Sequence, residues 1–449
     1  MSPGTMSHRE RTPLALVFTI VCIDLLGFGL VLPLLPIYGR ELTAGYTKDE
    51  AAWILGLLMV SFSLMQFLFA PLWGRLSDRI GRRPVLLLSL AGSAVFYACF
   101  GIATLWHSLA GMFLARIGAG IAAATIPTAQ AYIADVTPLD KRTRGMALIG
   151  AAFGLGFTLG PLIGAGAIFL SRDTGLSPWP GYAASLLSAL ALIVAIFKLP
   201  ESVREAAATV SHRRFNFASL REALSIPSIG LLLGSVFFGV FSLASFEGTI
   251  SLAIKSKLAS GPLDPQADWT LQTRLMLVFA YIGIIQCLVQ GILVRRLANY
   301  VSEAVLGAWG LGLSILGFAL LALVARAPED AVGALMLAAA VEVSGIALVF
   351  PAIQSLISRR SDPAKQGGIL GATESISSIA RITGVVFGVR LYLERPSLPF
   401  WAAAAMMGVV FVLLMLAIPR GRDWQAERGR TKEEGRRTKD SGRRKKEEG

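Results

Sequence analysis

The chain has 449 residues, of which 54% are hydrophobic and only 16% are charged. A soluble protein carries about 25% charged residues, so the composition excludes an ordinary soluble protein and indicates one that crosses a membrane many times. The net charge of +13 would favour nucleic-acid binding in a soluble chain. In a membrane protein it is better explained by basic loops gathered on one face of the bilayer.

Twelve apolar stretches are each long enough for a spanning helix, which needs roughly 20 residues. We expect an all-α membrane protein with spans at about 13–38, 51–73, 84–106, 108–132, 145–169, 179–199, 227–254, 271–294, 303–325, 331–357, 367–391 and 398–418. The first stretch is too long for a cleavable signal and is expected to be retained. The segments that share a bilayer face with the N-terminus contain more lysine and arginine than the segments on the opposite face. Both termini are therefore expected to lie in the cytoplasm, and the protein is expected to span the inner or plasma membrane.

The first span contains an acid, Asp24, in its middle. An ionised acid at membrane depth costs roughly 2.5–3.5 kcal/mol, so Asp24 must face a polar cavity or hold a proton. A carboxyl in that position can take up and release a proton as its surroundings alternate. A satisfied hydrogen bond between helices is the structural alternative.

A run of dense charge, residues 74–84, follows the second span. Charge this dense cannot lie in lipid, so the run is predicted to form a tight hairpin at the bilayer face. Its candidate functional residues are Gly74, Asp78, Arg79, Gly81, Arg82 and Arg83.

The fourth span contains Arg116, followed by glycines and alanines that allow close helix packing. An arginine at this depth needs an acid or water beside it, and Asp24 is the candidate partner. Gln130 lies on the same predicted helix face as Arg116. The fifth span has glycines and a proline that make a smooth, bendable packing face, at Gly156, Gly160, Pro161 and Gly164.

The chain is predicted to be duplicated, because a weaker echo of the charged hairpin, Gly291–Arg296, follows the eighth span. The expected organisation is a cytoplasmic N-tail (1–12), a six-helix bundle (13–200), a cytoplasmic linker (201–224), a second, pseudo-symmetric six-helix bundle (225–418) and a disordered basic tail (419–449). That tail is either solvated without a specific role or loosely attracted to anionic lipid.

Four ionisable residues of the second half lie within predicted spans: Glu247, Glu342, Glu374 and Arg381. Glu374 and Arg381 are seven residues apart and share nearly one helix face. They are two turns apart, too distant for a simple contact, and could bracket a cavity. No metal-ligand spacing occurs among the cysteines and histidines, so no metal or cofactor is expected.

These features together resemble the major facilitator superfamily, and within it the twelve-helix drug/proton antiporters that include the tetracycline efflux proteins. The resemblance rests on Leu26-Gly27 followed by Pro33–Pro36, on the run at 74–84, on the Arg116 segment and on the run at 156–165, and Tyr132–Asp135 is also similar to the tetracycline branch. The tetracycline exporters use an acid in the ninth helix, and here that span has none after Glu303. This difference argues against tetracycline as the substrate.

The resemblance implies an exporter that works by alternating access. It assigns proton coupling to Asp24, the proton relay or cavity charge to Arg116, and to Asp78 a contact that steadies the outward-facing state, at the N-terminal end of the eleventh helix. We therefore expect proton-coupled efflux of a small organic compound or drug, driven by the proton gradient, from a monomer that binds no nucleic acid.

Two other classes of function stay open. A facilitator or proton symporter for an endogenous metabolite, such as a sugar or organic anion, would suit two buried arginines. A receptor or scaffold without transport is disfavoured, because idle charges at membrane depth are costly. An enzyme is not expected, since the sequence shows no phosphate loop, metal cluster or nucleophile–base pair.

Overall fold

The computed structural model describes residues 8–137, 142–171, 175–202, 227–258, 268–297, 300–328, 331–361 and 366–420. Within these ranges the chain is helical and contains no strand. Twelve helical stretches are long and apolar enough to cross a membrane, and they fall where the sequence predicts spans. The predicted all-α membrane fold is confirmed. Most of the linker and the basic tail lie outside the described residues.

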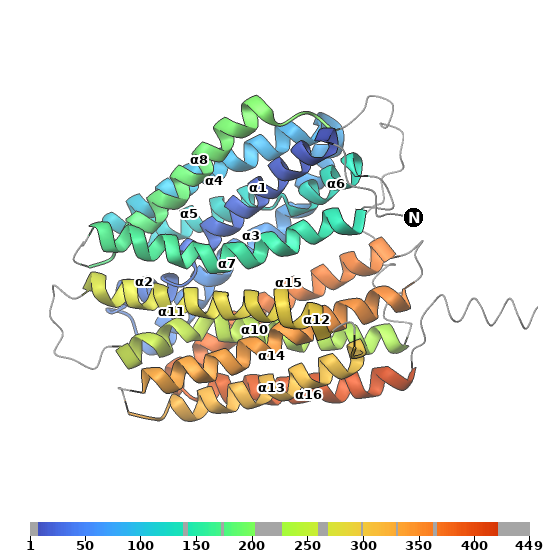
Figure 1. The fold of residues 1–449 in the computed structure, drawn as a ribbon. Helices are drawn as coiled ribbons and strands as arrows, with labels where there is room; N and C mark the ends of the chain where they lie inside the picture. The colour runs from blue at the N-terminus through green and yellow to red at the C-terminus, as the bar shows by residue number, and fades with distance from the viewer. Residues whose placement is uncertain are drawn as a thin grey trace, which may run out of the picture.

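Two six-helix halves lie against each other (Figure 1). The first half consists of α1 (His8–Val31), α2 (Leu35–Leu42), α3 (Lys48–Ile80), α4 (Arg82–Leu105), α5 (Leu109–Ala122), α6 (Ile126–Val136), α7 (Arg142–Ser171) and α8 (Trp179–Lys198). The second half consists of α10 (Pro227–Leu258), α11 (Asp268–Leu288), a π-helical turn (Val289–Val294), α12 (Arg295–Leu297), α13 (Glu303–Val324), α14 (Val332–Arg360), α15 (Gln366–Glu394) and α16 (Leu398–Arg420). We name the two ends of the bundle after residues that lie there, the Arg82 end and the Tyr38 end.

Prolines divide two of the predicted spans into shorter helices. The first span breaks between α1 and α2, at Pro33, and the fourth breaks between α5 and α6, just before Pro127. Proline lacks an N–H and its ring clashes with the preceding turn, which leaves backbone carbonyls without partners. At the second break the carbonyl oxygen of Ala123 accepts from Gln66 Nε2 at 3.1 Å, and that of Ile121 accepts from Trp73 Nε1 at 2.6 Å.

The charged run after the second span forms the tight hairpin that the sequence predicts, with a shorter connection than the predicted spans leave. Helix α3 continues through Asp78 to Ile80, and α4 begins at Arg82, so Gly81 alone connects the two helices. Gly81 has φ +100°, a backbone conformation that favours glycine. The predicted second span ends too early, because charged residues continue a helix beyond the bilayer face as readily as they begin a loop.

Glycines bring helices into backbone contact within the first half and between the halves. A Cβ added at Gly160 on α7 would lie 2.8 Å from the carbonyl carbon of Gly29 on α1. Between the halves, a Cβ at Gly283 on α11 would lie 2.7 Å from Thr158 Cα on α7. On the other side of the molecule, a Cβ added at Gly56 of α3 would lie 3.4 Å from Val386 Cα of α15. Small residues allow this close approach, which drives helix association inside membranes.

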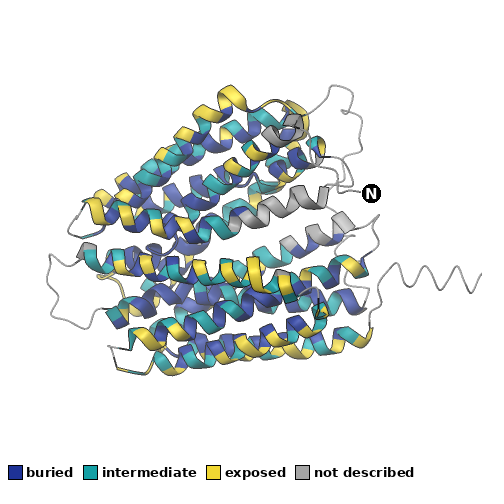
Figure 2. Cartoon of the chain, in the orientation of Figure 1, coloured by how far each residue is buried: buried dark blue, intermediate teal, exposed yellow. Residues whose placement is uncertain are grey.

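Large apolar side chains cover much of the outer surface, where a soluble protein would have polar ones. Leu170 is 83% exposed, Phe197 is 82% exposed and Leu114 is 64% exposed. Burial alternates along each helix between the bundle interior and this outer face (Figure 2). An apolar surface of this extent is stable only against lipid.

We expect Gly160→Ala to destabilise the first half by about 1–3 kcal/mol, because its methyl group would force α1 away from α7. The measurement is the midpoint of thermal unfolding in detergent. Gly166→Ala is the matched control, since a Cβ on that glycine of the same helix has no neighbour within 4 Å. Equal midpoints for the two variants would contradict this packing.

Candidate functional site

Asp24 lies on α1, half-buried against one face of α4. Its carboxylate accepts hydrogen bonds from Ser93 Oγ at 3.1 Å and from Ser89 Oγ at 3.4 Å. Ser89 Oγ also lies 3.1 Å from the hydroxyl of Thr125, beside the α5–α6 break. Tyr97 follows Ser93 one turn later, and Gly27 leaves the room in which its ring lies. The sequence analysis missed this polar row, although positions 89, 93 and 97 recur at helical spacing.

Arg116 on α5 is 1% exposed, and its guanidinium stacks on aromatic rings. Its central carbon lies 4.6 Å from the ring centre of Phe62 and 5.9 Å from that of Phe28. None of its nitrogens has a hydrogen-bond partner among the described residues. The predicted direct pairing with Asp24 is therefore not made in this conformation: the serines of α4 hold the acid, and the aromatic rings hold the arginine.

Glu247 and Arg381, treated as separate candidates from the sequence, form one ion pair. Arg381 Nη1 lies 2.6 Å from Glu247 Oε2, which joins α15 to α10. Seven residues further along α15, Gly388 allows α15 and α10 to approach closely, because a Cβ there would lie 2.8 Å from Ser245 Cα. The side chain of Glu374 lies outside the described residues, so its predicted place beside a cavity stays a prediction.

Glu342 on α14 is fully buried, and neither of its carboxylate oxygens has a hydrogen-bond partner among the described residues. Its backbone is fixed by Gly317 of α13, where an added Cβ would lie 2.7 Å from Glu342 Cβ. α13 and α14 therefore pack closely at Glu342. An unpaired acid at this depth is costly and marks Glu342 as a candidate binding residue.

A small cavity lies between the two halves. The second half supplies its polar residues, Glu247, Glu342 and Gln286. The first half supplies only apolar ones, Gly29, Leu32, Pro33, Phe157 and Pro161. Asp24 and Arg116 are not part of this lining, so this is not the polar cavity that the sequence predicts beside Asp24.

The fifth-span glycines contact different neighbours, while Pro161 lines the cavity. Gly156 lies against Leu25 of α1, Gly160 against Gly29, and Gly164 against Met276 of α11. This segment of α7 therefore packs against α1 within the first half and against α11 of the second half. Gln130 on α6 is exposed and lies away from the cavity lining.

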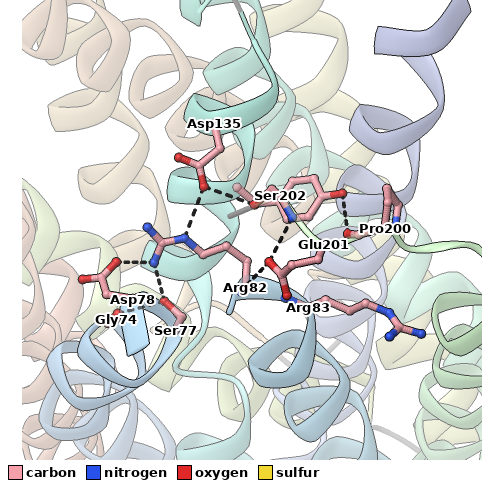
Figure 3. A network of polar contacts seen from close by, with 10 residues as sticks. Gly74, Ser77, Asp78, Arg82, Arg83, Asp135, Pro200, Glu201 and Ser202 are labelled. Atoms are coloured by element: carbon pink, nitrogen blue, oxygen red, sulfur yellow. Dashed lines mark hydrogen bonds and ion pairs between the residues drawn. The ribbon is translucent and has the colours of Figure 1, made fainter. Parts of the chain in front are cut away.

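The charged run forms a network at the Arg82 end (Figure 3). The Arg82 guanidinium donates to Asp78 and, at 2.7 Å, to Ser77 Oγ. Its Nε donates to Asp135 of α6 at 3.3 Å. Arg79 is exposed. The network joins α3, α4 and α6, and the predicted contact of Asp78 with the start of the eleventh helix stays a prediction, because the side chains there lie outside the described residues.

Gly74, a candidate functional residue of the charged run, makes no close contact with the described residues. A Cβ at this position would meet none of their atoms within 4 Å. The glycine that the local backbone requires is Gly81.

Glu201 is a structural residue that sequence reasoning assigned to the linker. Its carboxylate accepts from the backbone N–H of Arg82 at 2.9 Å and from that of Arg83 at 3.1 Å (Figure 3). An acid at this position satisfies orphan N–H groups and complements the positive end of α4. Ser202 Oγ donates to Asp135 at 3.1 Å, so the start of the linker is attached to the first half.

At the Tyr38 end, polar contacts connect the two halves. The side-chain oxygen of Gln272 on α11 accepts from Tyr38 Oη at 3.0 Å and from the Ser177 N–H at 3.3 Å. Its Nε2 donates to the Gly175 carbonyl at 2.6 Å. Asp49 of α3 pairs with Arg390 of α15 at 3.1 Å. We name this set of contacts the Tyr38-end closure.

Two bundles of six spanning helices, with a cavity enclosed between them, define a multi-pass membrane transporter. Residues 17–385 match the sequence profile of the Major Facilitator Superfamily, and the chain belongs to that superfamily. The family is one of transporters.

The chain is similar to known members over nearly its whole length. It is 31% identical to the tetracycline resistance protein, class C, of Escherichia coli, over 92% of this chain and 98% of that protein. It is 29% identical to major facilitator superfamily domain-containing protein 10 of Bos taurus, over 93% and 95%.

Solved structures have the same fold. The crystal structure of the human organic anion transporter MFSD10 (TETRAN) aligns with a TM-score of 0.60 and 27% identity, over 91% of this chain and all of that one. That of a D-xylose-proton symporter aligns with a TM-score of 0.68, over 89% and 96%, and at 16% identity shows likeness of fold alone.

We expect Glu201→Ala to destabilise the protein by about 0.5–2 kcal/mol, because two N–H groups of α4 would lose their acceptor. Thermal unfolding in detergent measures this loss. Glu41→Ala is the matched control, since Glu41 is exposed at the other end of the bundle. A midpoint for Glu201→Ala equal to that of the control would contradict the capping role.

Proposed function

We propose that the protein exports a small organic compound in exchange for protons, by alternating access of its central cavity. The observation that carries this proposal is the setting of Asp24, an acid inside a spanning helix whose partners are the neutral hydroxyls of Ser89 and Ser93. A hydroxyl donates to a carboxylate and accepts from a carboxylic acid. Both protonation states of Asp24 can therefore be hydrogen-bonded in the same place.

Arg116 supports the coupling role without being the direct partner of Asp24. Its guanidinium is buried against two aromatic rings and has no hydrogen-bond partner among the described residues. A charge in this state favours a conformation in which an acid or water comes closer. Loss of the proton from Asp24 would supply that acid, so the protonation state biases the arrangement of α1 against α5.

Alternating access is supported by the way the two halves meet, which differs between the Tyr38-end closure and the helix surfaces further from that end. The Tyr38-end closure rests on a few side chains, chiefly Gln272. Below it, the halves meet through small residues such as Gly283 and Gly56, which present little to interlock. Halves that meet in this way can rock about a site between them.

Topology and location follow from charge. The Arg82 end has the basic segments, so we infer that it faces the cytoplasm, as do both termini. The molecule would then be a multi-pass monomer of the cell membrane that uses the proton gradient as its energy source and needs no bound cofactor. The basic tail would make at most a weak contact with anionic lipid.

The relatives support two candidate functions. Similarity to tetracycline resistance proteins supports export, since removal of a compound produces resistance to it. The name of the human organic anion transporter MFSD10 supports a facilitator or symporter for an endogenous organic anion. Of the two arginines that favour an anion, Arg381 is already paired with Glu247, so export is the better-supported function.

We expect Asp24→Asn to abolish gradient-driven export while the protein still folds, because an amide at this position cannot exchange a proton. A growth screen of an expressing strain, against toxic compounds that include cations, anions and neutral molecules, measures export. Proteoliposomes with an imposed pH gradient then test the compound that gives the strongest protection.

The control for this screen is Glu41→Gln, which removes an acid from the exposed surface. It should protect as well as the original chain does. Export by Asp24→Asn at the original rate, or transport that ignores the pH gradient, would contradict proton coupling through Asp24.

We expect Gln272→Ala to open the Tyr38 end more often, because the closure loses its central donor and acceptor. The measurement is labelling by a membrane-impermeant maleimide of a cysteine at position 250, where Ile250 lines the cavity, with the native cysteines replaced by serine. Gln66→Ala removes a hydrogen bond inside the first half and is the control. Labelling that is equal in both variants would contradict the closure.

A further inference from the structure

The charged groups around the central cavity are not balanced. Two acids line it, Glu247 and Glu342, and no lysine, arginine or histidine is among the described residues of the lining. Glu247 is neutralised by Arg381 at 2.6 Å from behind the cavity wall. Glu342 has no such partner, so one negative group of the cavity remains unpaired among the described residues.

Glu342 is 0% exposed, and its backbone packs closely against Gly317 of α13. An isolated buried carboxylate is among the costliest groups in a protein interior, so the group either holds a proton or has a positive group beside it. A cation in the cavity is such a positive group. Cation binding and protonation would therefore compete at Glu342.

The rest of the cavity suits an apolar body. Its walls include Phe157 of the first half with Phe246 and Phe279 of the second, beside aliphatic side chains. Aromatic faces attract cations as well as apolar groups. Gln286 is the neutral polar group of the lining, so an anion would meet one amide and two acids.

We propose that the cavity binds an organic cation with an aromatic or otherwise apolar body, and that Glu342 takes its positive centre. This inference rests on the proposed transport function and names its substrate class. Glu342 is then the residue that selects charge, the aromatic walls select an apolar shape, and the Glu247–Arg381 pair keeps the second acid from attracting a second cation.

Equilibrium binding to the purified full-length protein in detergent tests this, with two probes of nearly equal shape and opposite charge. We expect tetraphenylphosphonium to bind and tetraphenylborate to bind at least about tenfold more weakly. This comparison needs no variant. Equal affinity for the two ions, or tighter binding of the borate, would overturn the proposal.

Variants assign the binding to Glu342. Glu342→Gln should weaken tetraphenylphosphonium binding by at least about tenfold, whereas Glu41→Gln, on the exposed surface, should leave it unchanged. Glu342→Asp keeps the charge and should keep the preference for the cation, which guards against a fold defect in the glutamine variant. Unchanged affinity in Glu342→Gln, or loss of the preference in Glu342→Asp, would overturn the assignment.

The binding measurement uses no gradient, so its outcome is separate from that of proton coupling. Absence of cation binding, with gradient-driven export of some other compound intact, would refute the substrate class alone. Cation binding through Glu342, with flux that ignores the pH gradient, would refute the proposed coupling alone.

Discussion

A polar group at membrane depth must find its partner inside the protein, and the structure depends on this requirement throughout. Where proline opens the fourth span, Gln66 and Trp73 of α3 take up the freed carbonyls. Where an acid enters the first span, serines of α4 hold it. At the Arg82 end, Glu201 accepts from the first N–H groups of α4. Arg116 and Glu342 are exceptions, because neither has a hydrogen-bond partner among the described residues, and each such group calls for an explanation.

The number and place of the spanning helices could be predicted from the sequence, because lipid imposes a length and an apolar composition that single stretches show by themselves. Boundaries were less predictable. Charged residues after the second span suggested a loop, but the helix continues to Ile80 and turns at Gly81. The sequence shows where the chain must leave the lipid, but it does not show where the backbone hydrogen bonds of the helix end.

Contacts between helices could not be predicted in the same way. Helical spacing places Arg116 on a face, but it does not say which neighbour that face meets, and the aromatic rings of Phe28 and Phe62 take the place expected for Asp24. Glu247 and Arg381 are 134 residues apart in the chain, and nothing local indicates that they meet. Glu201 was missed because it follows directly after a span and has the composition of a linker.

The two halves contribute unequally to the cavity, and this has a consequence for how such a protein changes over generations. The acid assigned to energy coupling lies in one half, while the carboxylates and the amide of the cavity wall lie in the other. Under the proposed function, mutations in α10, α11 and α14 would alter which compounds are accepted while the coupling group of the first half is inherited intact. A lineage built on this plan would then acquire protection against new toxic chemicals by single exchanges in one bundle.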